Sequence, residues 1–307
     1  MGRYVIRRLL QMIPVFFGAT LLIFLMVNVM GDPIAGLCGD RACDPATAAQ
    51  LEKEFGLDKP VWQQYLTYMG NVFTGDFGTA FNGQPVTELM ASSFPVTIRL
   101  TIVAIFFEIV IGITLGVITG LRRGSPVDTS VLVLTLVVIS IPTFVTGLLL
   151  QLLLGVKWGW IKPAVSPDAP FSELIVPGLV LASVSLAYVT RLTRTSIAEN
   201  KKADYVRTAV AKGLPRRRVT TRHLLRNSLI PVITFIGTDI GALMGGAIVT
   251  ERIFNIHGVG YQLYQGIIRQ NTQTVVGFVT VLVLVFLVAN LLVDLLYAVL
   301  DPRIRYA

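Results

Sequence analysis

The chain has 307 residues, of which 53% are hydrophobic and only 14% are charged. Its mean hydropathy of +0.70, with apolar runs of about 20 residues along the whole length, excludes a soluble globular enzyme, a small disulfide-rich module and a disordered chain. The net charge of +8 does not indicate nucleic acid binding, because the basic residues stand between the apolar runs and not along one face of a soluble domain.

The apolar runs predict an all-α membrane protein with six transmembrane helices. The first run, residues 9–30, carries no charge and follows three arginines, which predicts a retained signal anchor and a cytoplasmic N-terminus. The other runs lie at about 100–121, 131–154, 174–192, 229–250 and 275–300. Most Lys and Arg residues then fall on the cytoplasmic side, as the positive-inside rule requires, and the C-terminus is cytoplasmic as well.

Residues 1–95 are expected to form the first helix and an extracytoplasmic cap, and residues 96–307 a five-helix core. The segment between the first two spans is too aromatic for a disordered loop, so short helices are expected at 51–55 and 61–73. Cys38 and Cys43 lie in this segment, on the side where disulfides persist, and a local disulfide is expected, with two free thiols as the alternative.

Glycines recur at every fourth position in two of the spans. Such a stripe lets two helix backbones approach closely in lipid, so packing is favoured over the alternative of a smooth wall for a substrate path. The two sets are Gly112, Gly116 and Gly120 in the second span, and Gly237, Gly241 and Gly245 in the fifth.

Three carboxylates, Glu108, Asp239 and Asp294, fall within the apolar runs. Hydrogen-bonded positions at helix interfaces are the favoured interpretation, because an unpaired charge in the membrane is costly. The alternative is a proton-coupled secondary transporter with Glu108 or Asp239 as the proton carrier.

The sequence shows no sign of catalytic or metal chemistry. His223 and His257 are the two histidines and are predicted on opposite sides of the membrane, so they build neither a metal cluster nor a catalytic triad. The chain has no phosphate-binding loop, so any ATP and its Mg²⁺ must be bound by another chain.

The cytoplasmic segment at about 194–227 contains a short helix candidate, residues 203–213. Asp204 stands near its start and Lys212 at its end, and Gly213 is placed where a left-handed cap would close the helix. Val206, Ala209 and Val210 give it a narrow apolar face, which suits docking into a groove.

This segment also carries a resemblance to a known family. Residues 204–213 read Asp-Tyr-Val-Arg-Thr-Ala-Val-Ala-Lys-Gly, and residues 223–231 read His-Leu-Leu-Arg-Asn-Ser-Leu-Ile-Pro. This resembles the coupling loop of bacterial ABC importer permeases of the peptide and nickel branch. The general motif begins Glu-Ala-Ala where this chain has Arg207, Thr208 and Ala209, and Arg226 replaces a proline, as is typical of that branch.

Further motifs resemble the same family, in order and over nearly the full chain. They include Gly31-Asp32-Pro33, Gly56-Leu57-Asp58-Lys59-Pro60, Gly75-Asp76-Phe77-Gly78, Ser140-Ile141-Pro142, residues 254–260 (Phe-Asn-Ile-His-Gly-Val-Gly) and Asp301-Pro302-Arg303. The set resembles the first of the two permease subunits of dipeptide and oligopeptide importers.

The resemblance implies a type I ABC importer permease in the bacterial plasma membrane, without catalysis or a cofactor of its own. It implies four kinds of partner: a second homologous permease, two cytoplasmic ATPases, an extracytoplasmic binding protein and the lipid bilayer. Residues 251–274 are too apolar for a freely solvated loop, and are predicted to pack over the outer mouth and to meet the binding protein. The residues that it assigns to ATPase coupling are Asp204, Tyr205, Arg207, Thr208, Ala209, Lys212 and Gly213.

Overall fold

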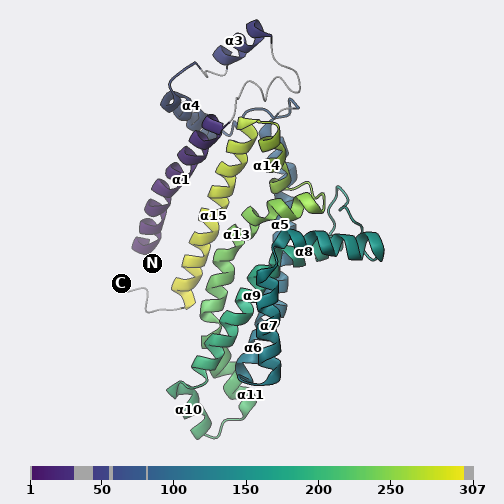
Figure 1. Ribbon diagram of the computed structural model, residues 1–307. Helices are drawn as coiled ribbons and strands as arrows, with labels where there is room; N and C mark the ends of the chain where they lie inside the picture. The colour runs from purple at the N-terminus through teal and green to yellow at the C-terminus, as the bar shows by residue number, and fades with distance from the viewer. Residues whose placement is uncertain (1, 31–43, 55–57, 81, 301–307) are drawn as a thin grey trace.

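The computed structural model describes residues 2–30, 44–54, 58–80 and 82–300, and these form helices and connecting turns (Figure 1). Five helices in this part of the chain are long and apolar enough to cross a membrane. They are α1 (Gly2–Met30), the continuous helix α5–η1–α6 (Val86–Phe107, Glu108–Ile113 and Thr114–Leu121), α9 (Ile175–Asn200), α13 (Ile230–Ile253) and α15 (Thr272–Leu300). The predicted all-α membrane fold is confirmed.

The prediction of one helix over 131–154 is corrected. Helix α7 (Pro126–Ser140) is followed by α8 (Thr143–Leu150) and η2 (Gln151–Lys157), and the two parts are bent by 97°. Ile141 between them is extended, with φ −91° and ψ 123°, because the ring of Pro142 disfavours a helical residue before it. If the bent pair counts as one span, the chain has six.

Helix α9 stands at the centre of the bundle. It packs against α5, η1 and α6 on one side and against α13 on another, while α15 covers α13 and α1 covers α15 (Figure 1). Its first half is rich in small and apolar residues, and fully buried Val180 and Ala182 belong to the largest apolar cluster, with Leu100 of α5 and Phe254 after α13. The expected span at 174–192 therefore ends too early, since the same helix continues to Asn200.

The segment expected to form the cap contains two described helices, α3 (Pro45–Glu54) and α4 (Val61–Thr74), the second preceded by Pro60. Helix α4 packs on the bundle through its tyrosines. The Tyr65 hydroxyl donates to the Phe17 carbonyl of α1 over 3.1 Å, and the Tyr68 hydroxyl lies 2.7 Å from the Thr280 hydroxyl of α15. Because these partners lie inside two spans, α4 is fixed against the side of the bundle and does not stand apart from it.

The expected division after residue 95 falls inside α5, which begins at Val86 directly after Pro85. Proline suits the start of a helix, where its missing N–H costs nothing. Ser92, Ser93 and Arg99 lower the hydropathy before residue 100 but do not interrupt the helix. The structure therefore marks no break at this position.

Candidate coupling site and translocation path

Helix α10 (Asp204–Ala211) lies beyond the end of α9, at one tip of the molecule (Figure 1). Asp204 in its first turn suits the positive end of the helix dipole. After the helix the chain turns at Gly213, whose φ of 71° is in the left-handed region. The Gly213 N–H donates to the Val210 carbonyl over 2.9 Å. The predicted helix and its glycine cap are confirmed.

The apolar face of α10 is occupied by this chain itself. Val206 and Ala209 are 5% and 4% exposed and pack in one cluster with Ile197 of α9 and with Val219 and Leu224 of η3 (Val219–Leu224). The prediction that Ala209 faces an external groove is therefore corrected. Burial of these two small side chains instead anchors α10 to the end of the bundle, and Val210 remains 61% exposed.

The other side chains of α10 point outward. Arg207 and Asp204 lie 3.8 Å apart, but both are largely exposed, so this ion pair contributes little stability. The outward face is available for a partner. Its exposed residues are Asp204, Tyr205, Arg207, Thr208, Val210, Ala211 and Lys212, the last just after the helix.

Polar contacts tie this region to the membrane helices. The buried Ser196 hydroxyl of α9 donates to the Ser228 carbonyl of α12 (Leu225–Ser228) over 2.8 Å. The Lys201 ammonium donates to the Leu121 carbonyl at the end of α6 over 3.0 Å. These hydrogen bonds join α9 to α12 and to the end of α6, and the apolar cluster packs α10 against the same end of the bundle.

An ion pair that the sequence analysis missed joins α7 to α9. Arg194 donates to Asp128 Oδ2 over 2.7 Å, and the same oxygen accepts the Gly124 N–H over 2.8 Å. Asp128 is 2% exposed. The two charged partners are 66 residues apart in sequence, so no local pattern links them.

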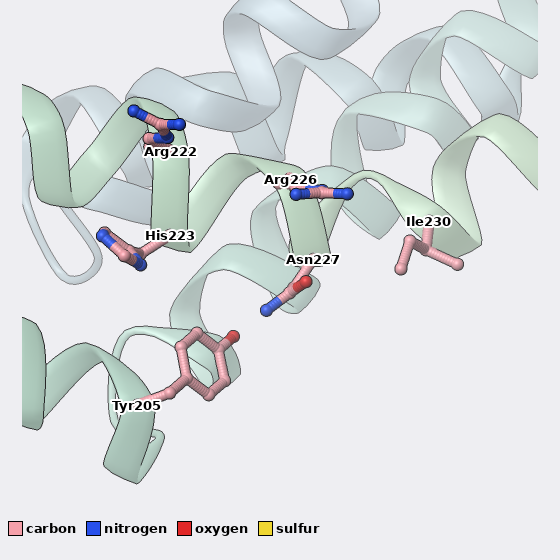
Figure 2. A pocket seen from close by; sticks show the side chains of 6 residues that line it. All are labelled: Tyr205, Arg222, His223, Arg226, Asn227 and Ile230. Atoms are coloured by element: carbon pink, nitrogen blue, oxygen red, sulfur yellow. The ribbon is translucent and has the colours of Figure 1, made fainter. Parts of the chain in front are cut away.

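A pocket of about 390 Å³ opens between α10 and the start of α13 (Figure 2). Tyr205 on α10 faces Asn227 across it, and the Tyr205 hydroxyl donates to Asn200 Oδ1 over 2.6 Å. The side chains that line it are Tyr205, Arg222, His223, Arg226, Asn227 and Ile230. Since two are arginines and none is acidic, the pocket suits an anionic group of a partner.

The glycine stripes pack helices as predicted at five of the six positions. A Cβ on Gly112 would lie 2.8 Å from Val189 of α9, and one on Gly120 would lie 2.9 Å from Ile197; Gly116 faces Thr193 of the same helix. In the fifth span Gly237 and Gly241 face Val293 and Phe286 of α15. The prediction that Gly245 packs against another helix is corrected, because nothing lies within 4 Å of its Cβ position.

The three intramembrane carboxylates have different surroundings. Asp294 forms an ion pair with Arg8 of α1 over 3.1 Å, as expected for an interface position. Glu108 is fully buried at the start of η1, and its carboxyl interacts with that of Asp239 on α13. Asp239 also lines a cavity between α8, α9 and α13.

At the opposite end of the bundle, Glu251 fixes the connection from α13 to α14 (Val259–Ile268). Its carboxylate is fully buried, accepts the Thr97 hydroxyl over 2.6 Å and accepts the Tyr261 N–H over 2.9 Å at the start of α14. Thr97 in turn accepts the Val259 N–H over 2.8 Å. Gly258 is required for space and not for a turn, because its Cβ would meet Glu251 and Thr97, while φ is positive at Asn255.

The loop between η2 and α9 lies against this connection. The Val165 N–H donates to the Phe254 carbonyl over 2.9 Å. Glu173 accepts the Lys162 ammonium over 2.6 Å and the Ser166 N–H over 2.7 Å. The Lys162 hydrogen bond, helped by the Ser166 N–H, lowers the pKa of Glu173 to about 2.

Two further expectations concern metal ligands and a disulfide. Among the described residues no group of three or more His, Cys, Asp or Glu side chains could hold a metal ion. The expected disulfide between Cys38 and Cys43 lies outside the described residues.

Comparison with known proteins identifies the family. The family model described as "binding-protein-dependent transport system inner membrane component" matches residues 112–306, and a model of the N-terminal part of such membrane components matches residues 1–101. The chain belongs to this permease family. It is therefore a multi-span inner-membrane component of a binding-protein-dependent transport system, as the sequence motifs predicted.

Curated relatives of the permease cover it end to end. It is 38% identical to the dipeptide transport system permease protein DppB of Escherichia coli (strain K12), over 100% of this chain and 99% of that protein. It is 35% identical to the oligopeptide transport system permease protein AppB of Bacillus subtilis (strain 168) and 36% identical to the glutathione transport system permease protein GsiC of Pectobacterium atrosepticum, each over 100% of both chains.

A solved structure supports the fold. The permease is similar to a chain of the MetNI methionine ABC transporter in an inward-facing conformation, with a TM-score of 0.59 over 69% of this chain and 96% of that chain. The sequence identity is 18%, so the likeness concerns the fold alone.

Proposed function

We propose that this permease forms, with a second homologous permease, the translocation pathway of an ATP-driven importer of dipeptides and oligopeptides. The observation that carries the proposal is the end-to-end similarity, at 38% identity, to a dipeptide permease. The family requires a binding protein for delivery of the substrate. Glutathione, the substrate named for another relative, is itself a short peptide, so the proposed substrate class covers it.

In this proposal α10 transmits motion from two ATPase subunits in the cytoplasm, where both chain termini also lie. Its outward residues would meet the ATPases, and its inward residues, Val206 and Ala209, hold it to α9 and η3. ATP-driven closure of the ATPases would move α10 with the bundle ends attached to it. Such a rigid movement switches the side on which the pathway opens.

The pocket beside Tyr205 supports this docking mode. Arg222 and Arg226 line it without a carboxylate from this chain, so an acidic side chain of the ATPase would find charge-assisted hydrogen bonds there. At the other end, Arg252 stacks 4.9 Å from the Tyr264 ring centre on the rigid α13–α14 connection. This aromatic and cationic surface is the proposed contact for the binding protein.

The permease itself carries out no covalent chemistry in this scheme, and it needs no cofactor. ATP and Mg²⁺ are bound by the ATPase subunits.

The test is uptake of a labelled dipeptide by proteoliposomes that contain both permeases and the ATPases, with the binding protein outside. Uptake should require ATP in the lumen of the proteoliposomes, on the side of the ATPases. It should be unchanged by an imposed proton gradient. Uptake driven by the proton gradient without ATP would instead support the secondary transporter in which Glu108 or Asp239 carries the proton.

A further inference from the structure

Two carboxyl groups, those of Glu108 and Asp239, meet inside the membrane part of the bundle. Glu108 is fully buried, and neither of its carboxyl oxygens has a hydrogen-bond partner among the described residues. Its carboxyl interacts electrostatically with that of Asp239 on α13. The buried Oδ2 of Asp239 also has no geometric hydrogen-bond partner among the described residues. Unpaired carboxyls in a membrane are costly, so their retention side by side points to a function.

Asp239 connects this pair to a cavity of about 280 Å³ between α8, α9 and α13. Two hydroxyl groups line it with Asp239, those of Thr143 and Ser185, and its other walls include Phe144 and Val249. Along Gly246 the wall is open, because nothing lies within 4 Å of its Cβ position. The cavity thus combines one anionic group, two hydroxyls and apolar walls, and no cationic side chain lines it.

We propose that this cavity binds the terminal ammonium group of a peptide during its passage, with Asp239 as the substrate-binding carboxylate. An ammonium group has three N–H donors and no acceptor, and Asp239, Thr143 and Ser185 supply three acceptors. The first side chain of the peptide would lie against Phe144 and Val249. This inference rests on the proposed function, because it names the end of the peptide that this permease holds.

The opposite end of a peptide does not fit. A terminal carboxylate in this cavity would be repelled by Asp239 and would meet no cation. A bound ammonium, in contrast, would form charge-assisted hydrogen bonds with the Asp239 carboxylate. Glu108 does not line the cavity, so it is a positioning residue whose buried carboxyl lies against Asp239.

The first test measures uptake at saturating, peptide-loaded binding protein in the complete transporter. Asp239→Asn should lower the maximal uptake rate about tenfold, the equivalent of one lost charge interaction, and Asp239→Glu should recover part of it. Thr238→Ala is the matched control, because Thr238 is adjacent and exposed but does not line the cavity.

The second test asks whether the cavity recognises the ammonium. A dipeptide with a photoreactive first side chain, and its N-acetyl form, are cross-linked to the purified transporter without binding protein. The free amine should label α8 or α13 at least several-fold more than the acetylated form, and Asp239→Asn should remove the difference.

The outcomes separate the two proposals. Equal labelling by both forms, or an unchanged maximal rate for Asp239→Asn in a transporter that imports peptide, overturns the ammonium site and leaves the proposed function intact. Either result is expected if Glu108 and Asp239 only share a proton and do not bind substrate. Failure of the wild-type transporter to import peptide with ATP overturns the proposed function itself.

Discussion

Ala209 and Val210 are neighbours in sequence and have opposite surroundings. Ala209 is 4% exposed against Val219 and Leu224, whereas Val210 is 61% exposed on the outward face. An apolar pattern alone places both on one docking face, because they follow the same helical spacing. Their separation depends on which side of α10 the rest of the chain covers.

Substitution of each by aspartate should therefore have a different result. Ala209→Asp buries an unpaired charge in the anchor of α10, and should lower the melting temperature and the yield of the assembled transporter. Val210→Asp should leave both unchanged and reduce peptide-stimulated ATP hydrolysis several-fold. Arg216→Ala, an exposed change outside α10, is the control. Full stimulation in Val210→Asp would exclude this face as the ATPase contact.

Gly213→Val tests the glycine turn. The φ of 71° at this position costs a β-branched residue on the order of 1–2 kcal/mol, so α10 should end differently and its outward face should be misaligned. Transport and transport-linked ATP hydrolysis should fall together at normal membrane levels. Gly159→Val is the matched control, because Gly159 also has a positive φ of 64° and open space around it but lies far from α10. Equal loss in both variants would point to general strain.

Between elements, the Asp128–Arg194 ion pair should make α7 and α9 move together. Asp128→Asn leaves the shape and weakens the pair, which should destabilise the transporter by on the order of 1–3 kcal/mol, less than for a fully buried pair because the Arg194 side chain is 16% exposed. Thermal unfolding in detergent measures the loss. Arg207→Gln, which breaks an exposed ion pair with Asp204, should leave the thermal stability unchanged.

The loop before α9 should respond to acid through Glu173. Its pKa is about 2 in the folded state against an ordinary 4.5, so the ionised form is the one that the fold favours. The stabilisation is therefore complete above about pH 4.5 and is lost as the pH falls toward 2. Fluorescence of the nearby Trp158 and Trp160 should change over this range in the wild type. In Glu173→Gln the signal should already be altered at neutral pH and should stay flat.

Sequence patterns predict the elements of this protein better than their contacts. The spans follow from apolar runs, and α10 follows from Asp204, its spacing and Gly213, which are local signals. The bend at Pro142 was not predicted, because residues 131–154 form one apolar run, and its 97° angle depends on packing of α8 against α9 and α13. The Asp128–Arg194 pair and the buried position of Ala209 could not be predicted, because they depend on segments that meet only in the fold.

At the scale of the molecule, hydrogen bonds assign each connection to one side of the membrane. The Lys201 ammonium bonds the Leu121 carbonyl, so the α6–α7 connection lies on the side of α10. The loop before α9 bonds Phe254, and Arg99 in the second half of α5 donates to the Ala169 carbonyl over 3.1 Å. This loop therefore lies on the opposite side. Helices α7 and α8 join the two ends of the bundle, which favours one crossing by the bent pair and a total of six spans.

This sidedness gives the last prediction. In a variant with Cys38 and Cys43 replaced by serine, a single cysteine at Lys162 should react with a membrane-impermeant maleimide added to intact cells. A single cysteine at Lys202, an exposed position before α10, should react only after the membrane is opened. The physical reason is that α9 separates the two positions by one full crossing. Protection of Lys162Cys in intact cells, with labelling after lysis, would show instead that α8 re-enters the cytoplasmic side and that the helix count is five.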